Sequence, residues 1–139
     1  MKLNKLLLIL FFSIKFIGVS YAGGTFYECT IKDSYNLNNE TGKIELTSES
    51  WNEIFKGKKF NVSRLSGDIV GSTLLNHDAK QIVVINKGSK EYNFKTISIF
   101  DHPNGEKEWQ ILTVQEITNS QEKPFIAFSV AGIITGICK

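Results

Sequence analysis

The two cysteines stand near opposite ends of the chain, and this spacing constrains the fold more than any other feature. Cys29 lies in an alternating stretch, 25–33, and Cys138 is the penultimate residue. Tyr27 and Ile31 share the face of Cys29, as side chains two apart in a strand do. Bridged cysteines need Cα atoms within about 7 Å of each other. A disulfide would make the first and last strands neighbours, as barrel closure requires.

Two other arrangements of these cysteines stay open at this point. Both thiols can remain unpaired and pack as small apolar groups. If the cysteines lie far apart in space, an open sandwich replaces the barrel as the expected fold.

Residues 1–22 have the composition of a secretory signal peptide. Two lysines precede an apolar run over 6–19, and small residues at Ser20 and Ala22 fit cleavage after Ala22. A membrane anchor is the alternative, but the run is shorter than the roughly 20 residues of a spanning helix. Lys15 also interrupts it. We expect a periplasmic or secreted protein with no stable membrane span, in a compartment where disulfides form.

Removal of the signal peptide changes the charge balance. Three of the 16 basic residues are lost, which leaves 13 against 14 acidic residues, a net charge of −1. This balance gives no reason to expect nucleic acid or an anionic membrane as a partner. The remaining part, 23–139, has the size of one domain with a single core, and we expect it to be all-β.

About eight alternating segments, joined by turns rich in glycine, asparagine and aspartate, predict a small antiparallel barrel or a sandwich. The segment 81–86 is apolar on both faces, which predicts a central or covered strand. Within 91–100 the apolar residues change face, which predicts a bulge or a strong twist. Asn104-Gly105 predicts a hairpin. The expected strands are 25–33, 43–47, 60–64, 69–75, 81–86, 91–100, 109–117 and a last stretch over 125–139 with bends at Gly132 and Gly136.

One short helix is expected at 51–56. Ser50 and Glu53 have the spacing of a capping box, and Gly57 fits a helix C-terminus. Trp51, Ile54 and Phe55 then fall on one helical face, and we expect Trp51 and Phe55 to belong to the core.

Several stretches carry a resemblance to known proteins. They are 26–33 (FYECTIKD), the set Phe60, Val62, Arg64, Gly67 and Gly71, the pair Phe94-Lys95, and 135–139 (TGICK). On these residues the chain resembles a set of small exported bacterial proteins to which no activity is attached. The resemblance implies an acid before the arginine, where this chain has Ser63. In architecture alone it is similar to the periplasmic lysozyme inhibitors, which are small disulfide-bearing antiparallel barrels.

The search for catalytic chemistry leads us to expect no catalytic residue, no cofactor and no metal. His77 and His102 each sit in a turn beside an aspartate, Asp78 and Asp101. A zinc site needs three or four ligands, so these turns would have to meet in space. The sequence contains no nucleophile elbow, no glycine-rich phosphate loop and no Cys-x-x-Cys motif. Asn39 and Asn61 are each the first residue of a match to the N-glycosylation pattern, which matters only in a host that glycosylates its proteins.

A possible binding surface is basic and flanked by Phe55 and Phe60. It consists of Lys56, Lys58, Lys59 and Arg64. The alternative is an ordinary solvated edge, because lysine on an edge strand also blocks aggregation. Arg64 can equally clamp its turn to a carboxylate such as Asp68.

The function expected first is that of a non-enzymatic, exported protein-binding or inhibitor-like module, with an envelope or extracellular protein as its partner. The second expectation is a small-ligand carrier with a hollow, calycin-like barrel, since eight strands can enclose one small ligand. The third is an enzyme, for which one histidine would have to share a pocket with a carboxylate.

Overall fold

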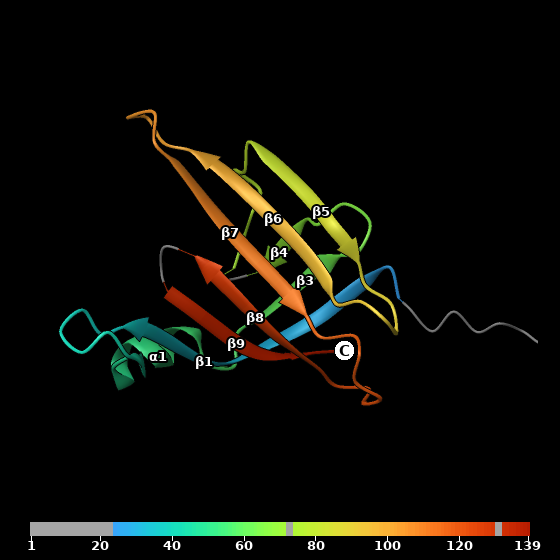
Figure 1. Ribbon diagram of the computed structural model, residues 1–139, viewed down its shortest axis with the longest axis horizontal. Coiled ribbons are helices and arrows are strands. Elements are labelled where there is room, and N and C mark those ends of the chain that lie inside the picture. The colour runs from blue at the N-terminus through green and yellow to red at the C-terminus, as the bar shows by residue number, and fades with distance from the viewer. Residues whose placement is uncertain (1–23, 72–73, 130–131) are drawn as a thin grey trace, which may run out of the picture.

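A computed structural model describes residues 24–71, 74–129 and 132–139, so the expected signal peptide at 1–22 lies outside the described residues. The strands form one antiparallel sheet that curls into a half-barrel, in the order β4-β3-β1-β9-β8-β7-β6-β5, with β2 paired to β1 (Figure 1). The elements are β1 (Phe26–Leu37), β2 (Ile44–Leu46), α1 (Glu49–Phe55), β3 (Lys59–Ser63), β4 (Ile69–Gly71), β5 (Gln81–Lys87), β6 (Phe94–Asp101), β7 (Lys107–Val114), β8 (Lys123–Ser129) and β9 (Gly132–Cys138).

The disulfide between Cys29 and Cys138 is present, and it joins the first and last strands as predicted. The two residues face each other across the β1–β9 pair, with Cα atoms 3.9 Å apart. This strand pair lies inside the sheet order, whereas the free edges belong to β4 and β5. The bridge therefore fixes the middle of a curled open sheet and not the seam of a closed barrel.

The inner face of the curl holds a single hydrophobic core. Tyr27, Cys29 and Ile31 all point into it, as their alternation predicts. Side chains from every strand except β2 and β5 fill this interior, and Val84 of β5 packs against it. The buried set is Tyr27, Cys29, Ile31, Phe55, Phe60, Val62, Ile69, Leu74, Phe94, Leu112, Val114, Phe125, Ala127, Ile134 and Cys138.

Side chains and loops span the gap between the two free edges. Asn76, which is 1% exposed, donates from Nδ2 to Ser98 Oγ on β6 and to the carbonyl of Gly67, both at 2.9 Å. Its Oδ1 accepts the backbone N–H of Ile69 on β4 at 2.6 Å. One buried amide thus connects the β4 edge to the β6 side of the sheet, and its own polar atoms are satisfied.

The helix is present, but its predicted capping box is wrong. Helix α1 starts at Glu49, after Ser48, whose side chain makes no capping hydrogen bond. Phe55 is buried in the core as predicted, whereas Trp51 is 44% exposed, so that part of the prediction is wrong. Asn52 anchors the helix instead, since its Oδ1 accepts the backbone N–H of Ser34 in β1 at 2.9 Å. The expectation for Gly57 is confirmed, because its φ of 76° is the left-handed conformation common just after a helix.

The prediction that 81–86 forms a central strand is wrong. This segment is β5, which lies at the edge of the sheet and exposes Val83 and Ile85. Its double apolar character has two causes: Val84 faces the core, while Val83 belongs to an apolar outer surface of the sheet. An extra residue at Ile85 also shifts the β5–β6 register between Val84 and Asn86.

Of the bulge or strong twist predicted within 91–100, the bulge is wrong, because the extra residue of the β5–β6 pair is Ile85 on β5. β6 pairs with β7 without interruption from Phe94 to Asp101. Its buried face consists of Phe94, Thr96 and Ser98. The two hydroxyl side chains are tolerated there because Thr96 donates to the Val83 carbonyl at 3.2 Å, and Ser98 accepts from Asn76. The pattern looked out of phase because polar residues occupy inner positions.

The remaining turn and strand predictions hold in outline. The hairpin around Asn104-Gly105 connects β6 and β7, with Gly105 at φ 84°. Of the expected strand at 69–75, Ile69–Gly71 form β4, Leu74 and Leu75 are not part of a strand, and 72–73 lie outside the described residues. The last stretch is two strands, β8 and β9, with Gly132 at φ 107° at the start of β9. The bend predicted at Gly136 is wrong, because Gly136 pairs with Ile31 and Phe125 inside β9.

Candidate functional site

The predicted basic surface is divided between two environments. Lys56, Lys58 and Lys59 are exposed around the turn between α1 and β3, where Lys59 lies 3.8 Å from Glu28. Arg64 is different: only 18% of its side chain is exposed, and its Nη2 lies 3.2 Å from Glu116 Oε1. The carboxylate that Arg64 clamps is therefore Glu116 and not Asp68. The lysines remain a predicted binding surface, while Arg64 is engaged in the fold.

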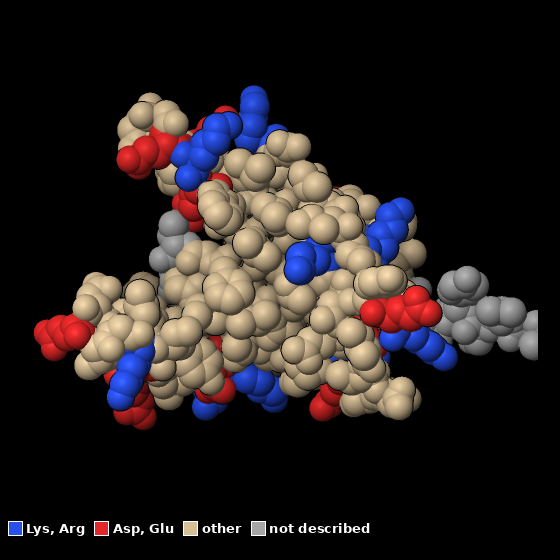
Figure 2. Space-filling view, in the orientation of Figure 1, with Lys and Arg blue, Asp and Glu red and all other residues tan. Residues whose placement is uncertain are grey.

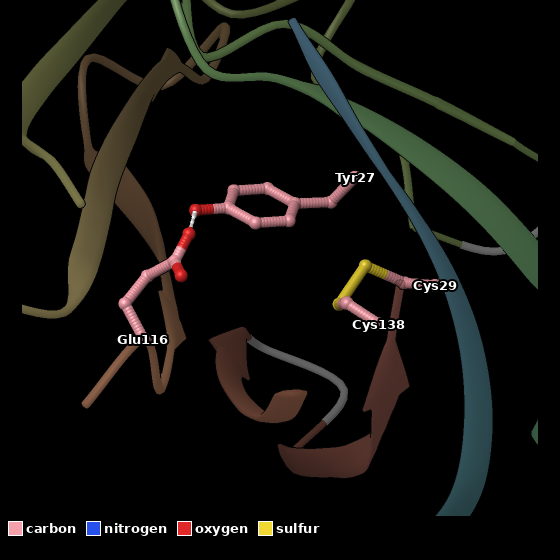
Figure 3. The surroundings of a disulfide bond; sticks show 4 residues. All are labelled: Tyr27, Cys29, Glu116 and Cys138. Carbon is pink, nitrogen blue, oxygen red and sulfur yellow. Dashed lines mark hydrogen bonds between the residues drawn. A yellow bond between two sulfur atoms is a disulfide. The ribbon is translucent and has the colours of Figure 1, made fainter. Parts of the chain in front are cut away.

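Arg64 is the centre of a polar cluster at one end of the half-barrel. Its guanidinium lies 5.0 Å from the centre of the Tyr27 ring and donates to the carbonyls of Lys87 and Gly88, each at 3.2 Å. The Tyr27 hydroxyl donates to Glu116, and Figure 3 shows the two side chains pointing toward each other beside the disulfide. The cluster thus connects β1, the end of β3, the β5–β6 turn and the segment after β7.

The buried charges of this cluster balance one another, which indicates that the cluster stabilises the fold. Burial raises the pKa of the Tyr27 phenol far above its usual value, and the hydrogen bond to Glu116 adds to the rise, while Arg64 opposes it. Lys123 Nζ lies 3.8 Å from the Glu116 carboxylate and donates to the Thr118 carbonyl at 2.9 Å. Two cations and a phenol proton therefore balance one carboxylate that is 11% exposed.

The outer face of the sheet, opposite the core, carries a continuous apolar row. Directly paired residues lie on the same face of a sheet, so the strand register identifies the members of this row. One chain of pairings runs from β2 through β1, β9, β8, β7 and β6 to the β5 edge. Its members, the outer row, are Leu46, Tyr35, Ile133, Phe128, Ile111, Ile97 and Val83.

The outer row is accessible from solvent. Leu46 is 55% exposed, Phe128 43% and Val83 38%. Antiparallel sheets with one solvated face normally place polar residues there. Among the described residues α1 is the only helix, and it packs against β1, so the row has no helical cover on β5 to β8.

The residues beside the outer row are also mostly uncharged. On one side Ile99 pairs with Trp109, which is 61% exposed. On the other side Thr113, Ile126 and Thr135 follow one another across β7, β8 and β9. Figure 2 shows the same arrangement: a broad uncharged field covers the front strands, and acidic and basic residues lie mainly around its border.

In each of the two histidine turns the imidazole contacts a carboxylate. His102 Nε2 lies 2.8 Å from Glu108 Oε2, and His77 Nε2 lies 2.9 Å from Asp78 Oδ2. Asp78, Asp101 and His102 border one cleft, so residues of both turns lie around the same opening, although His77 does not line it. Over 24–71, 74–129 and 132–139, no three His, Cys, Asp or Glu side chains are grouped in a way that could hold a metal ion.

Comparison with known proteins identifies no relative. Neither protein-family models, nor curated proteins, nor solved structures match this chain. In the part of the chain that the structure describes, no helix is long and apolar enough to cross a membrane.

Sequence reasoning did not find the outer row or the partner of Arg64. The signal for the row was present in part, because 81–86 is apolar on both of its faces. Membership of the row depends on which residues stand opposite each other on seven strands, and this register is not visible in one strand alone. Glu116 lies 52 positions after Arg64 in the chain, and no local pattern connects them.

Proposed function

We propose that this chain is a non-enzymatic, exported protein-binding module that docks its partner on the outer row. The observation that carries the proposal is the register of seven apolar residues across seven strands, three of them 38–55% exposed and the other four half-buried. Single exposed apolar residues are ordinary on protein surfaces, whereas a contiguous apolar patch marks an interaction site. The disulfide fits an oxidising compartment, the periplasm or the exterior.

The small number of charged residues around the outer row indicates what kind of partner surface would fit it. Lys95 and Asp33 are the charged residues in the row next to the outer row, and they lie at its two ends. The centres of protein interfaces are depleted of charge and enriched in aromatic residues, and Phe128 and Tyr35 supply the latter here. The partner is therefore a folded protein that presents an apolar, weakly charged surface. A second copy of this chain is the competing occupant, and the test below separates the two.

The other two expected functions have less support. A ligand carrier with a hollow barrel needs an enclosed space along the inside of the curl, and a contiguous cluster of buried side chains lies there, beside a cleft of ≈ 430 Å³ that Phe55, Leu74 and Ile134 border. An enzyme needs a reacting group positioned against a base. His102 and Glu108 lie 2.8 Å apart and do share a cleft, but the imidazole is 46% exposed and the pair by itself supplies a base without a positioned reacting group.

The test compares capture by variants that differ only on the outer row. Phe128→Asp places a charge in the middle of the row at a side chain that is 43% exposed, so the fold should tolerate it. Val70→Asp is the matched control, because Val70 is 66% exposed on β4, away from the row. Each purified protein is used to capture partners from envelope or culture fluid of its source, and its mass is measured by sedimentation.

The proposal expects one partner that wild type and Val70→Asp capture and Phe128→Asp loses, while all three sediment as monomers. Loss of a central contact of this kind should weaken binding by roughly 30-fold or more, as hot-spot residues do. Equal capture by Phe128→Asp would contradict the proposal. A wild-type dimer that Phe128→Asp dissociates would assign the row to self-association instead.

A further inference from the structure

A separate cleft lies between the β6–β7 hairpin, the segment after β4 and helix α1. Its volume is ≈ 430 Å³, within the range of small-ligand pockets. Phe55, Leu74 and Ile134 form its apolar walls, and all three are buried. The outer row is on the opposite side of the sheet, since Ile134 points inward and its neighbour Ile133 points outward.

Gln110 is the unusual residue of this cleft. It lies on the inner face of β7, lines the cleft and is only 6% exposed. Its Nε2 is fully covered and has no hydrogen-bond partner among the described residues. A buried amide that lacks a partner is unfavourable for folding, and native proteins contain few of them. A leucine of similar size would avoid this penalty, so the amide fits a role that the folded chain alone does not satisfy.

The rim of the cleft is acidic. Asp78, Asp101 and Glu108 all line it, and the one basic side chain on the lining is His102. Each carboxylate already has a neighbour: Asp101 is 3.4 Å from Lys107, Asp78 is 2.9 Å from His77, and Glu108 is 2.8 Å from His102. The Lys107 and His77 side chains are 68% and 65% exposed and can turn away into solvent. An acidic rim around apolar walls attracts cations and disfavours anions.

We propose that this cleft binds a cationic group carried on an apolar stem, an alkyl- or arylalkyl-amine or the equivalent part of a lysine or arginine side chain. The stem lies against Phe55 and Leu74, and the cation lies among the carboxylates of the rim. The Gln110 amide turns about its terminal bond and donates to an acceptor on the ligand or to a water that the ligand holds. This site is independent of the outer row.

The experiment uses three probes of one shape and different charge: 4-phenylbutylamine, 4-phenylbutanol and 4-phenylbutyrate. Each is titrated into the ¹⁵N-labelled chain, and NMR follows the side-chain NH₂ resonances of Gln110 together with the backbone amides of Phe55 and Leu74, which line the same cleft. These backbone amides report binding in the Gln110→Leu variant, which lacks the side-chain signal. The amine should shift these resonances with a Kd on the order of 1 mM, as expected for a ligand of this size. The alcohol should bind more weakly, and the acid should bind least.

Two variants test the residues. Asp78→Asn should weaken amine binding roughly 1.5- to 5-fold, the range for one exposed charge. Gln110→Leu should weaken it roughly 2- to 10-fold while leaving the Tm unchanged or higher, because it removes an unpaired buried group. Asp68→Asn, an acid outside this cleft, should bind like wild type.

Three results would overturn the proposal. The first is an absence of Gln110 shifts with the amine up to about ten times its expected Kd. The second is binding of the acid as strong as that of the amine. The third is unchanged amine binding by Gln110→Leu together with a lower Tm, which would make Gln110 a packing residue.

Nα-acetyl-lysine amide, which keeps its free ε-ammonium group, is the fourth probe and distinguishes the two sources of the cation. If it binds as well as 4-phenylbutylamine, a lysine side chain of a protein is the favoured ligand. If it binds much more weakly, the small amine is favoured. This comparison is interpreted only if the amine binds more tightly than the alcohol and the alcohol more tightly than the acid.

Discussion

Cys29 and Cys138 face each other directly on adjacent antiparallel strands, and both are fully buried. Their neighbours Glu28 and Lys139 exchange two backbone hydrogen bonds, at 3.1 and 2.9 Å. The covalent bridge thus repeats a contact that the sheet already makes. It also closes a loop of 109 positions, nearly the whole folded part of the chain.

Reduction of this disulfide should lower the free energy of unfolding by about 2–5 kcal/mol, because the unfolded chain regains the entropy of a long open loop. Urea denaturation with and without a reducing agent measures the difference. The double variant Cys29→Ala with Cys138→Ala should show no response to the reductant. An identical urea midpoint for the oxidised and reduced wild type would contradict the expectation.

Arg64→Met should destabilise the chain by about 2–3 kcal/mol, since it leaves the mostly buried Glu116 without its closest cation and frees two carbonyl acceptors. Arg64→Lys should recover only part of the loss, because one ammonium cannot reproduce the forked guanidinium contacts. Lys56→Met, at an exposed lysine, is the control and should change stability by less than about 0.5 kcal/mol. If Arg64→Met changed the free energy of unfolding as little as Lys56→Met does, the cluster would not stabilise the fold.

The stability of the chain should fall at alkaline pH. The folded-state pKa of Tyr27 is raised, so its contribution is fully present below the unfolded-state pKa of about 10. Above that pH the unfolded chain releases the phenol proton while the folded chain keeps it, and unfolding becomes easier by up to about 1.4 kcal/mol per pH unit. Urea midpoints of wild type and Tyr27→Phe are compared across this pH range, because both proteins share the lysines and the other tyrosines. The midpoint of the variant should fall less steeply with pH than that of wild type. Parallel curves would contradict the assignment.

Asn76→Ala should destabilise the chain by about 2–4 kcal/mol, because it removes a buried amide that serves Ile69, Gly67 and Ser98 at once. The loss should appear first as faster amide hydrogen exchange at the β4 edge, which the Asn76 amide holds against β6. An exposed asparagine, Asn104, provides the control substitution. A uniform change in exchange over the whole sheet would show that Asn76 does not hold this edge in particular.

Local pattern predicted much of the fold and little of the surface. The alternation of Tyr27, Cys29 and Ile31 and the Asn104-Gly105 turn are short-range signals, and the structure confirms both. The inward position of Thr96 and Ser98 depends on hydrogen bonds to Val83 and Asn76, which lie far away in sequence. Trp51 and Ile54 follow a helical period, but Asn52 decides which side of α1 faces β1. The edge position of β5 is a property of the strand order and not of 81–86.

The most direct test of the outer row is site-specific photo-crosslinking. p-Benzoylphenylalanine replaces Phe128 in one variant and Val70 in another, and each protein is irradiated in extract of its native compartment. We predict a discrete crosslinked product with one heterologous protein from position 128 and none from position 70. The same product from both positions, or none from position 128 while the variant remains folded, would contradict docking on this face.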